Sequence, residues 1–247
     1  MFQGIQAGFL TTANHDNSEL YEKAQAALAA VDSVLLKSHV VGCERSNNSV
    51  NLAVNTPSGP KIIQAKKVLI TMPPTLSNLE PFDLDETENV IFRQFSASGY
   101  YTGLIRNSGI PDNVDIQNIG SDTPFNIPVL PGLYSIDPTG VPGLHKFLYG
   151  SPTVLSNEAV KEDVLASVNK LRTAGTLNTT NPEFVIFSSH SPFLMTVPSE
   201  AIKDGFYRNL TGLQGYRSMF YTGAAFDTHD SSSLWQFTEA LLPKLVA

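Results

Sequence analysis

One stretch near the end of the chain, residues 218–245, constrains the possible folds more than any other. Its first residues, Ser218 to Thr222, include two aromatic side chains and predict a short buried strand that stops at Gly223. Asp230 and the serines that follow it are good N-cap residues, so a helix is expected to begin there. Residues at helical spacing continue it: Leu234, Phe237, Thr238, Leu241, Leu242 and Leu245. The stretch therefore predicts a strand, a tight turn of small residues and a helix N-terminus.

A turn of this kind suits the binding of an electron-rich group. Small residues in the turn let a ligand come close to the backbone. The first N–H groups of the helix have no partner inside the helix, and its N-terminus carries a partial positive charge. The pattern thus predicts a ligand site at the turn, although an ordinary strand followed by a capped helix has the same pattern.

The segment Phe220-Tyr221-Thr222-Gly223, continued by Ser232-Ser233-Leu234-Trp235 and Thr238-Glu239, resembles the C-terminal FAD-binding segment of the flavin-containing amine oxidoreductases. It is similar in particular to fungal FAD-dependent oxidoreductases of the β-cyclopiazonate dehydrogenase type. The resemblance implies that the ribityl and pyrophosphate chain of FAD is lined by Gly223, Ala224 and Ala225. It also implies that flavin N1 and the C2 carbonyl, where reduction places negative charge, face backbone N–H groups of Ser233, Leu234 and Trp235. Trp235 is alternatively a core anchor.

Composition narrows the classes of partner. The chain has 247 residues, of which 42% are hydrophobic and 16% charged, a profile typical of a globular protein. Its net charge of −7 and the lack of a basic cluster argue against nucleic acid or an anionic membrane as partner. No run approaches the roughly 20 apolar residues that span a bilayer. Cys43 is the single cysteine, so a disulfide framework and a cysteine metal cluster are excluded.

The first part of the chain predicts a helix followed by a β-ribbon. Asn17 or Ser18 caps the helix, and one apolar stripe runs along it: Leu20, Ala24, Ala27, Leu28 and Val31. Strands are expected at 34–36, 40–44, 50–54, 61–65 and 67–72, with a turn at 57–60 and an end at Pro73-Pro74. This order again resembles the superfamily, which implies that Val40 or its neighbour Val41 lies beside the FAD adenine. On composition alone, Val40 is a core valine.

The sequence pattern of residues 75–187 differs from that of the first part of the chain and predicts a sheet with one long helix. An acidic segment at 80–89 precedes a strand-like stretch at 91–106, and turn-rich sequence continues to Gly143. Further strands are expected at 144–149 and 184–188, with a helix between them that Ser156 caps. In position and size this part resembles the substrate domain of the superfamily.

The G-x-G-x-x-G turn with which superfamily members bind the FAD pyrophosphate does not occur in this sequence. We therefore expect an α/β fold (mixed α+β): the C-terminal part of a Rossmann-like FAD-binding domain plus a mixed-sheet substrate domain, with the N-terminal βαβ unit missing. The expected boundaries are 1–74 for the partial FAD-binding domain, 75–187 for the substrate-binding domain and 188–247 for the return to the FAD-binding domain. A sheet edge and an apolar face are left uncovered, so we expect poor solubility, a missing N-terminal half as partner, or self-association.

The resemblance also implies a substrate side. Ser189 to Phe193 falls where amine oxidases place the segment that faces the flavin, which makes His190 and Phe193 candidate substrate contacts. His190 is alternatively a turn residue before Pro192. Tyr101 stands nearest to the position of a lysine that many relatives bridge through water to flavin N5. Because no cysteine follows Cys43, cysteinyl attachment is excluded there and FAD is expected to bind non-covalently.

These observations predict an FAD-dependent oxidoreductase of the amine oxidase or dehydrogenase kind, inactive as this chain alone, that moves a hydride from a small-molecule C–H bond to flavin N5. The sequence assigns no general base and predicts no metal site. A non-catalytic binding or scaffold protein derived from a flavoenzyme is the alternative. A hydrolase built on Ser189, His190 and Asp227 is disfavoured, because the chain lacks a G-x-S-x-G nucleophile elbow.

Overall fold

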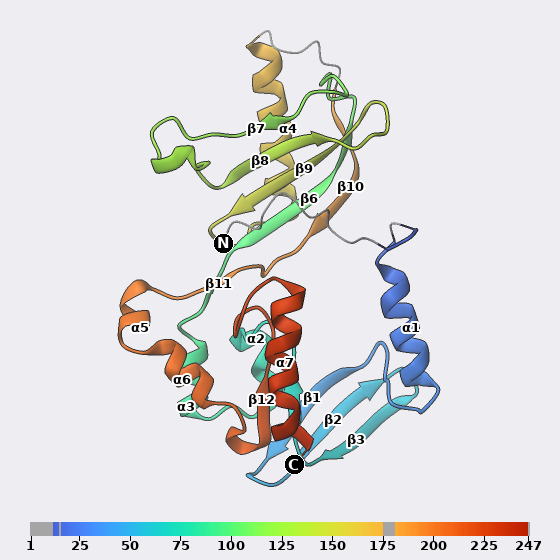
Figure 1. Cartoon of the computed structure of the whole chain (residues 1–247), viewed down its shortest axis with the longest axis vertical. Coiled ribbons are helices and arrows are strands. Elements are labelled where there is room, and N and C mark those ends of the chain that lie inside the picture. The colour runs from blue at the N-terminus through green and yellow to red at the C-terminus, as the bar shows by residue number, and fades with distance from the viewer. Residues whose placement is uncertain (1–11, 15, 175–180, 247) are drawn as a thin grey trace.

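The computed structural model describes residues 12–14, 16–174 and 181–246. The chain forms a five-stranded sheet and several smaller sheets. Figure 1 shows that sheet at the top with a long helix behind it, and a β-ribbon, short strands and several helices below. Each part has its own cluster of buried hydrophobic side chains. The chain passes between the parts where β5 (Ser96–Ala97) pairs with β11 (Met195–Thr196) in antiparallel fashion. This crossing brings residues far apart in sequence close to the turn at Gly223.

The ribbon consists of β1 (His39–Arg45), β2 (Val50–Thr56) and β3 (Gly59–Ala65), paired antiparallel in that order. The apolar alternation predicted along β2 is confirmed, because Val50, Leu52 and Val54 are all buried. The strand expected at 34–36 does not form. Asp32 and Lys37 on either side of it adopt left-handed φ angles of 50°, which turn the backbone away from an extended path.

Helix α1 (Ser18–Ala29) forms as predicted, but its apolar stripe is not covered. None of its residues is buried, and the side chains of Leu20 and Leu28 are 50% and 47% exposed. Asn17 precedes the helix without a side-chain capping hydrogen bond. Most of a helix's stability in a protein comes from packing of its apolar face, so α1 receives little of that stabilisation within this chain.

Strand β12 (Met219–Tyr221) pairs in parallel with β4 (Val68–Ile70), and the three register pairs run from Met219 opposite Val68 to Tyr221 opposite Ile70. All of β12 is buried. A parallel sheet is normally covered on both faces and has more than two strands. Within the described residues this pair has no further strand on either edge.

Residues 76–92, which include the acidic segment, form helices that the sequence analysis did not predict: α2 (Leu76–Leu79), the 3₁₀ helix η1 (Glu80–Phe82) and α3 (Glu86–Phe92). Asp85 and Glu88 form a capping box at the start of α3, in which each side chain accepts a hydrogen bond from the other residue's backbone N–H. Helices α5 (Ser199–Lys203) and α6 (Phe206–Gly212) and the 3₁₀ helix η3 (Tyr216–Ser218) follow later. Phe92 and Leu210 belong to the same cluster of buried hydrophobic side chains, the lower core, which lies in the lower part of the molecule. This core therefore extends beyond the domain boundary expected at residue 75.

The upper sheet has the strand order β10-β6-β9-β8-β7. Its strands are β6 (Gly99–Arg106), β7 (Ile116–Gln117), β8 (Gly132–Pro138), β9 (Leu144–Ser151) and β10 (Glu183–Ser189), with the 3₁₀ helix η2 (Pro124–Asn126) between β7 and β8. Every neighbouring pair is antiparallel, whereas the sequence predicts a mixed sheet. The helix between β9 and β10 is confirmed as α4 (Asn157–Thr173), with Ser156 accepting from the N–H of Ala159 at 3.2 Å.

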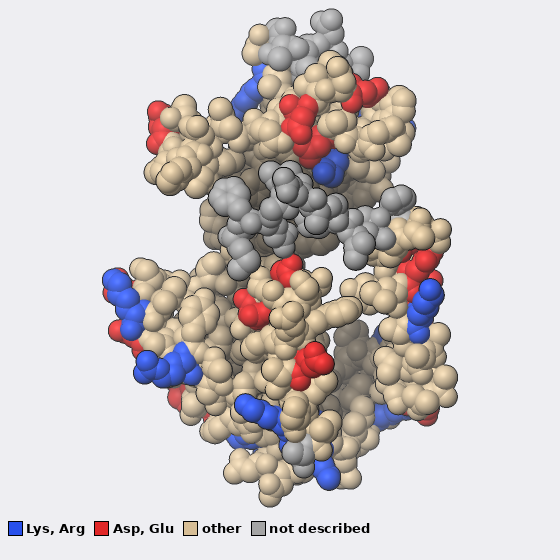
Figure 2. All heavy atoms as spheres, viewed as in Figure 1, with Lys and Arg blue, Asp and Glu red and all other residues tan. Residues whose placement is uncertain are grey.

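On the face shown in Figure 2, Lys and Arg side chains are scattered among Asp and Glu, and they form no continuous basic surface outside the grey residues. This distribution agrees with the net charge of −7. No helix within the described ranges has the length and apolar character that crossing a membrane requires. Among the same residues, no group of three or more His, Cys, Asp or Glu side chains is placed to hold a metal ion.

Candidate functional site

The strand, turn and helix predicted at 218–245 are present, and the turn is built around Gly223. Thr222 continues the pairing of β12, since its N–H donates to the carbonyl of Ile70 at 2.9 Å. Gly223 then adopts a φ of 121°, which side chains with a Cβ rarely permit, and a Cβ there would lie 3.4 Å from the carbonyl oxygen of Thr71. The N–H of Phe226 closes the turn on the Gly223 carbonyl at 2.9 Å. Glycine is therefore needed for the backbone path itself.

Helix α7 (Ser231–Val246) begins directly after Asp230, where the sequence predicts a helix start. The Asp230 carboxylate accepts from the backbone N–H of Ser233 at 2.9 Å and from the hydroxyl of Ser232. These bonds lower the pKa of Asp230. The N–H of Leu234 donates to the Asp230 carbonyl at 3.0 Å. Two of the three N–H groups expected to face a flavin are thus engaged by the cap in this structure.

A cavity of about 310 Å³ lies against the turn. Four segments contribute to it: the residues after β4 (71–74), the segment that leads into β11 and its first residue (192–195), the turn itself (222–225), and the start of α7 with the residues before it. Among the described residues that line it, His229 has the single ionisable side chain. The remaining lining is apolar, hydroxylic or backbone, so the cavity suits an uncharged ring or chain whose polar atoms reach backbone groups.

Aromatic side chains form one wall of this cavity. The centre of the Phe193 ring lies 4.6 Å from that of His229, and the same ring stacks on Tyr100 of β6 with a centre-to-centre distance of 4.8 Å. Phe193 therefore links the upper sheet to the segment that leads into α7. Tyr100 also lies 6.1 Å from the ring of His190.

The structure brings together some of the predicted site residues. Lining the cavity at the turn are Gly223, Ala224, Ala225, Leu234 and Phe193. The side chain of Trp235 is 66% exposed and points into neither the cavity nor the core, which excludes the alternative of a core anchor. Ser233 is exposed, with its N–H bound to the cap.

Three other predicted residues lie away from the cavity. Val40 is opposite Val54 in the ribbon and packs against the lower core half-buried, while Val41 is exposed. Tyr101 is 0% exposed in the upper core, where its hydroxyl donates to the carbonyl of Leu155 and accepts from its N–H, at 2.8 and 2.7 Å. The structure thus does not bring Tyr101 to the cavity, because alternate residues of a strand point to opposite faces and Tyr100 takes the outer one.

His190 follows the last residue of β10 and donates its backbone N–H to Tyr100 at 2.8 Å. Its side chain is exposed and does not line the cavity. Within the described residues no hydrogen bond connects Ser189, His190 and Asp227. They therefore do not form a catalytic triad in this structure, since a triad requires hydrogen-bond contact between its members.

Sequence reasoning missed His229 and Met195 as cavity residues. His229 is one of five histidines in the chain, and nothing local marks its contact with Phe193, which lies 36 positions earlier in the numbering. A usable signal was its position directly before the helix cap, because residues there face whatever the helix N-terminus faces. Pro73 and Pro74 were recognised as the end of a strand, and the structure adds that they line the cavity.

Tyr221, the last residue of the strand that leads to Gly223, is fixed by hydrogen bonds. Its hydroxyl donates to Glu88 Oε1 at 3.0 Å, and burial together with this carboxylate raises the pKa of Tyr221. Gln214 adds bonds to the backbone of the same residue, donating to its carbonyl at 2.8 Å and accepting from its N–H at 3.0 Å. Side-chain bonds thus fix the strand immediately before the turn.

No family model matches the chain. In sequence it is 42% identical over 249 residues to the FAD-dependent oxidoreductase oblC of Cochliobolus heterostrophus, across 97% of this chain and 52% of that protein. It is 39% identical to the FAD-dependent oxidoreductase pigF of Monascus ruber, across 99% and 53%. It is 33% identical to the beta-cyclopiazonate dehydrogenase of Aspergillus flavus, across 92% and 50%. The chain spans about half the length of the curated relatives it matches.

Solved structures give the same picture of the fold. The CLA-producing fatty acid isomerase from P. acnes matches 85% of this chain and 48% of its own, with a TM-score of 0.65 and 16% identity. Cyclohexylamine oxidase from Brevibacterium oxydans IH-35A matches 92% of this chain and 53% of its own, with a TM-score of 0.53 and 12% identity. At these identities the likeness concerns the fold alone.

The fold is accordingly that of about half of a flavin amine oxidase-like protein, an α/β arrangement with the turn at Gly223 in one part and an antiparallel sheet in the other. Within that class, the chain is a relative of the fungal FAD-dependent oxidoreductases, including beta-cyclopiazonate dehydrogenase, and it resembles their C-terminal half.

Proposed function

We propose that this chain supplies the C-terminal half of an FAD-dependent oxidoreductase: one side of the FAD site and the domain that covers the substrate. The observation that carries the proposal is the cavity at Gly223, whose backbone is open to a ligand, in a chain related over nearly its whole length to proteins named FAD-dependent oxidoreductases. FAD, when bound, would supply the hydride acceptor.

The residues present fit part of this cofactor. Gly223, Ala224 and Ala225 offer backbone and small side chains to the ribityl and pyrophosphate chain, and Leu234 lines the same cavity at the start of α7. A volume of about 310 Å³ is at the lower end of ordinary small-molecule sites, roughly 300–1,000 Å³. It therefore receives part of a dinucleotide. Contacts of Val40 with the adenine, and of the Ser233 and Trp235 backbone with the flavin, remain proposals.

The substrate is a small molecule, as expected for relatives of this kind, and Phe193 is the residue we place closest to it. Its ring forms the cavity wall between Tyr100 and His229. An aromatic wall orients an apolar substrate and excludes water from the reacting carbon. His190 lies at the exposed end of the same aromatic group and is proposed to contact the substrate from outside.

The rest of the cofactor site would come from a second unit that carries the dinucleotide-binding turn. Three features support this partner. The parallel pair of β4 and β12 has no third strand among the described residues, the stripe on α1 is uncovered, and Trp235 on α7 is exposed. One added α/β unit would extend the sheet and cover apolar helix faces.

The test is a fusion protein. The part of the Cochliobolus heterostrophus relative that this chain does not match is joined to the N-terminus of this chain, and the purified product is titrated with FAD while its absorbance and melting temperature are recorded. We expect one FAD per fusion and a higher melting temperature with FAD. The matched control is the same fusion with Gly223→Val, which puts a branched side chain at a glycine-only backbone angle beside the cavity.

A fusion that melts cooperatively but stays colourless, while the intact relative binds FAD, would overturn the proposal. That result would favour the alternative, a scaffold protein that has kept the fold of a flavoenzyme and lost its cofactor.

A further inference from the structure

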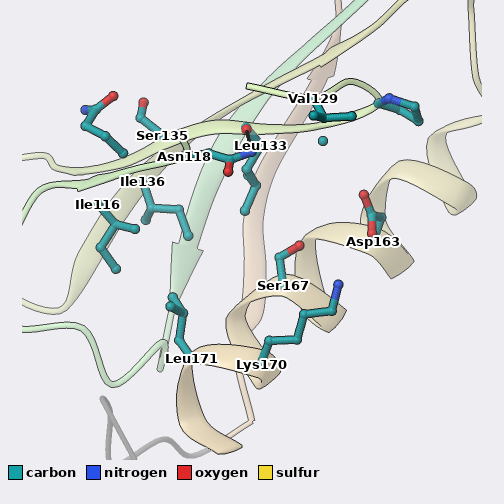
Figure 3. Close-up of a pocket in the computed structure, with 13 residues that line it drawn as sticks. Ile116, Asn118, Val129, Leu133, Ser135, Ile136, Asp163, Ser167, Lys170 and Leu171 are labelled. Carbon is teal, nitrogen blue, oxygen red and sulfur yellow. Dashed lines mark hydrogen bonds between the residues drawn. The ribbon is translucent and has the colours of Figure 1, made fainter. Parts of the chain in front are cut away.

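A second cavity lies in the upper part of the molecule, between α4 and the edge of the five-stranded sheet (Figure 3). It encloses about 380 Å³ and shares no lining residue with the cavity at Gly223. The helix contributes Asp163, Ser167 and Lys170 at its polar end. Nothing in the proposed oxidoreductase function uses this cavity.

Helix α4 presents two different stripes to its domain. Val160, Val164 and Val168 are 0% exposed and pack in the upper core. Asp163 and Ser167 are each one position before a core valine, so they are turned by about 100° around the helix, toward β8. Figure 3 shows the side chains of Asp163, Ser167 and Lys170 rising from the helix toward the strands. A polar wall thus faces the sheet across open space.

The two charged residues on this wall, Asp163 and Lys170, do not form a salt bridge with each other. Asp163 Oδ2 accepts from the hydroxyl of Tyr149 at 2.9 Å, which leaves the second carboxylate oxygen available. In the part of the chain that is described, no salt bridge includes Asp163 or Lys170. Neither the Ser167 hydroxyl nor the Lys170 ammonium has a hydrogen bond to these residues. One site thus offers a negative acceptor, a hydroxyl and a positive donor.

The other end of the cavity is largely apolar. Three polar residues of the sheet side also line it, Gln117, Asn118 and Ser135, and each donates a hydrogen bond to another residue of the chain. Ile116 and Ile136 point down from the sheet in Figure 3, and Leu171 rises toward them from the helix. Ile136 is 1% exposed, so this end is a wall of the core. A cavity with a few polar groups at one end and an apolar remainder is typical of a site for a small molecule.

We propose that this cavity binds a small zwitterion with an apolar side chain, that is, a free α-amino acid such as leucine. The ammonium group donates to Asp163, the carboxylate accepts from Lys170 and Ser167, and the side chain packs on Ile116, Ile136 and Leu171. A simple carboxylate has no ammonium group to bind Asp163, and a simple amine has no carboxylate to bind Lys170. Charge-assisted bonds to both ends distinguish the zwitterion from either.

The test is calorimetric titration of the chain with L-leucine, isocaproate and isoamylamine. The last two molecules have the leucine side chain but lack the ammonium and the carboxylate, respectively. We expect one saturable leucine site, with each analogue bound at least roughly tenfold more weakly, because a charged hydrogen bond contributes about that factor. The fusion protein contains the same cavity, so failure of FAD binding leaves this measurement unaffected.

Two variants test the charges of Asp163 and Lys170 separately. Asp163→Asn keeps an acceptor for Tyr149 and removes the charge; it should reduce leucine affinity roughly tenfold and abolish the preference over isocaproate. Lys170→Gln should reduce leucine affinity by a similar factor and abolish the preference for leucine over isoamylamine. The controls are Glu162→Gln and Lys161→Gln, whose residues lie on α4 but do not line the cavity. The proposal is overturned if leucine does not bind to a cooperatively melting chain, or if the variants and their controls bind it equally.

Discussion

Arg45 of β1 and Glu88 of α3 form an ion pair that is completely shielded from solvent, with both side chains 0% exposed. Arg45 Nη1 donates to Glu88 Oε1 at 2.9 Å, and Tyr221 of β12 donates to the same oxygen. Arg45 Nη2 also donates to the carbonyl of Asp83 at 2.8 Å. The pair therefore joins the ribbon, the acidic helix and the strand that leads to Gly223. A group with so many partners fixes the relative position of three segments.

Glu88→Ala should strongly destabilise the chain, because it leaves the Arg45 charge buried without its partner. We expect a loss of about 3–5 kcal/mol in the free energy of unfolding. The control is Glu86→Ala on the same helix, whose pair with Arg93 is 77% and 53% exposed and should contribute at most about 1 kcal/mol. Urea denaturation measures both. Equal losses in the two variants would mean that the buried pair has no special role.

The local part of this arrangement was readable from sequence, and the long-range part was not. Asp85 and Glu88 have the spacing of a capping box, so α3 could have been predicted where only an acidic segment was recognised. The pairing of Glu88 with a residue 43 positions earlier leaves no local signal. The site divides in the same way. Gly223 and Leu234 were predicted from one continuous pattern, whereas the contact of Phe193 with His229 depends on how two parts of the fold meet.

Gly223→Ala should destabilise the chain through the backbone alone. The φ of 121° belongs to a region that residues with a Cβ occupy at a cost of roughly 1–3 kcal/mol. Gly212→Ala is the control, because Gly212 ends α6 with open space around its Cα and no strained φ. Thermal unfolding of the two variants should show a loss only at Gly223. If both variants melt like the wild type, the turn does not require glycine.

Tyr101→Phe separates a core role from a substrate role. Removing the hydroxyl leaves the N–H and the carbonyl of Leu155 without their partner, so we expect about 1–3 kcal/mol less stability. In the fusion described above, FAD affinity should be unchanged. A variant with wild-type stability but weakened FAD or substrate binding would instead return Tyr101 to the site. Tyr100→Phe is the matched control, since Tyr100 stacks on Phe193 at the cavity wall.

Trp235 reports on the partner surface, because it is the single tryptophan of the chain and its side chain is 66% exposed. In the chain alone, its fluorescence should be readily quenched by iodide or acrylamide. In the fusion, an added α/β unit should cover this face of α7 and reduce the quenching several-fold. Trp235→Phe supplies the background signal. Equal quenching in the chain and the fusion would mean that the proposed partner does not contact α7.

Asp230 should make the start of α7 sensitive to acid. Its hydrogen bonds with Ser232 and Ser233 lower its pKa below the ordinary value of 3.8. A carboxylate with a lowered pKa in the folded state contributes stability that is fully present above the ordinary value and is lost as the pH falls through the folded pKa. Asp230→Asn keeps an acceptor for the cap but does not titrate. The advantage of the wild type over this variant in melting temperature should therefore shrink as the pH is lowered through that range. Identical pH profiles for the wild type and Asp230→Asn would contradict the proposed role of the cap.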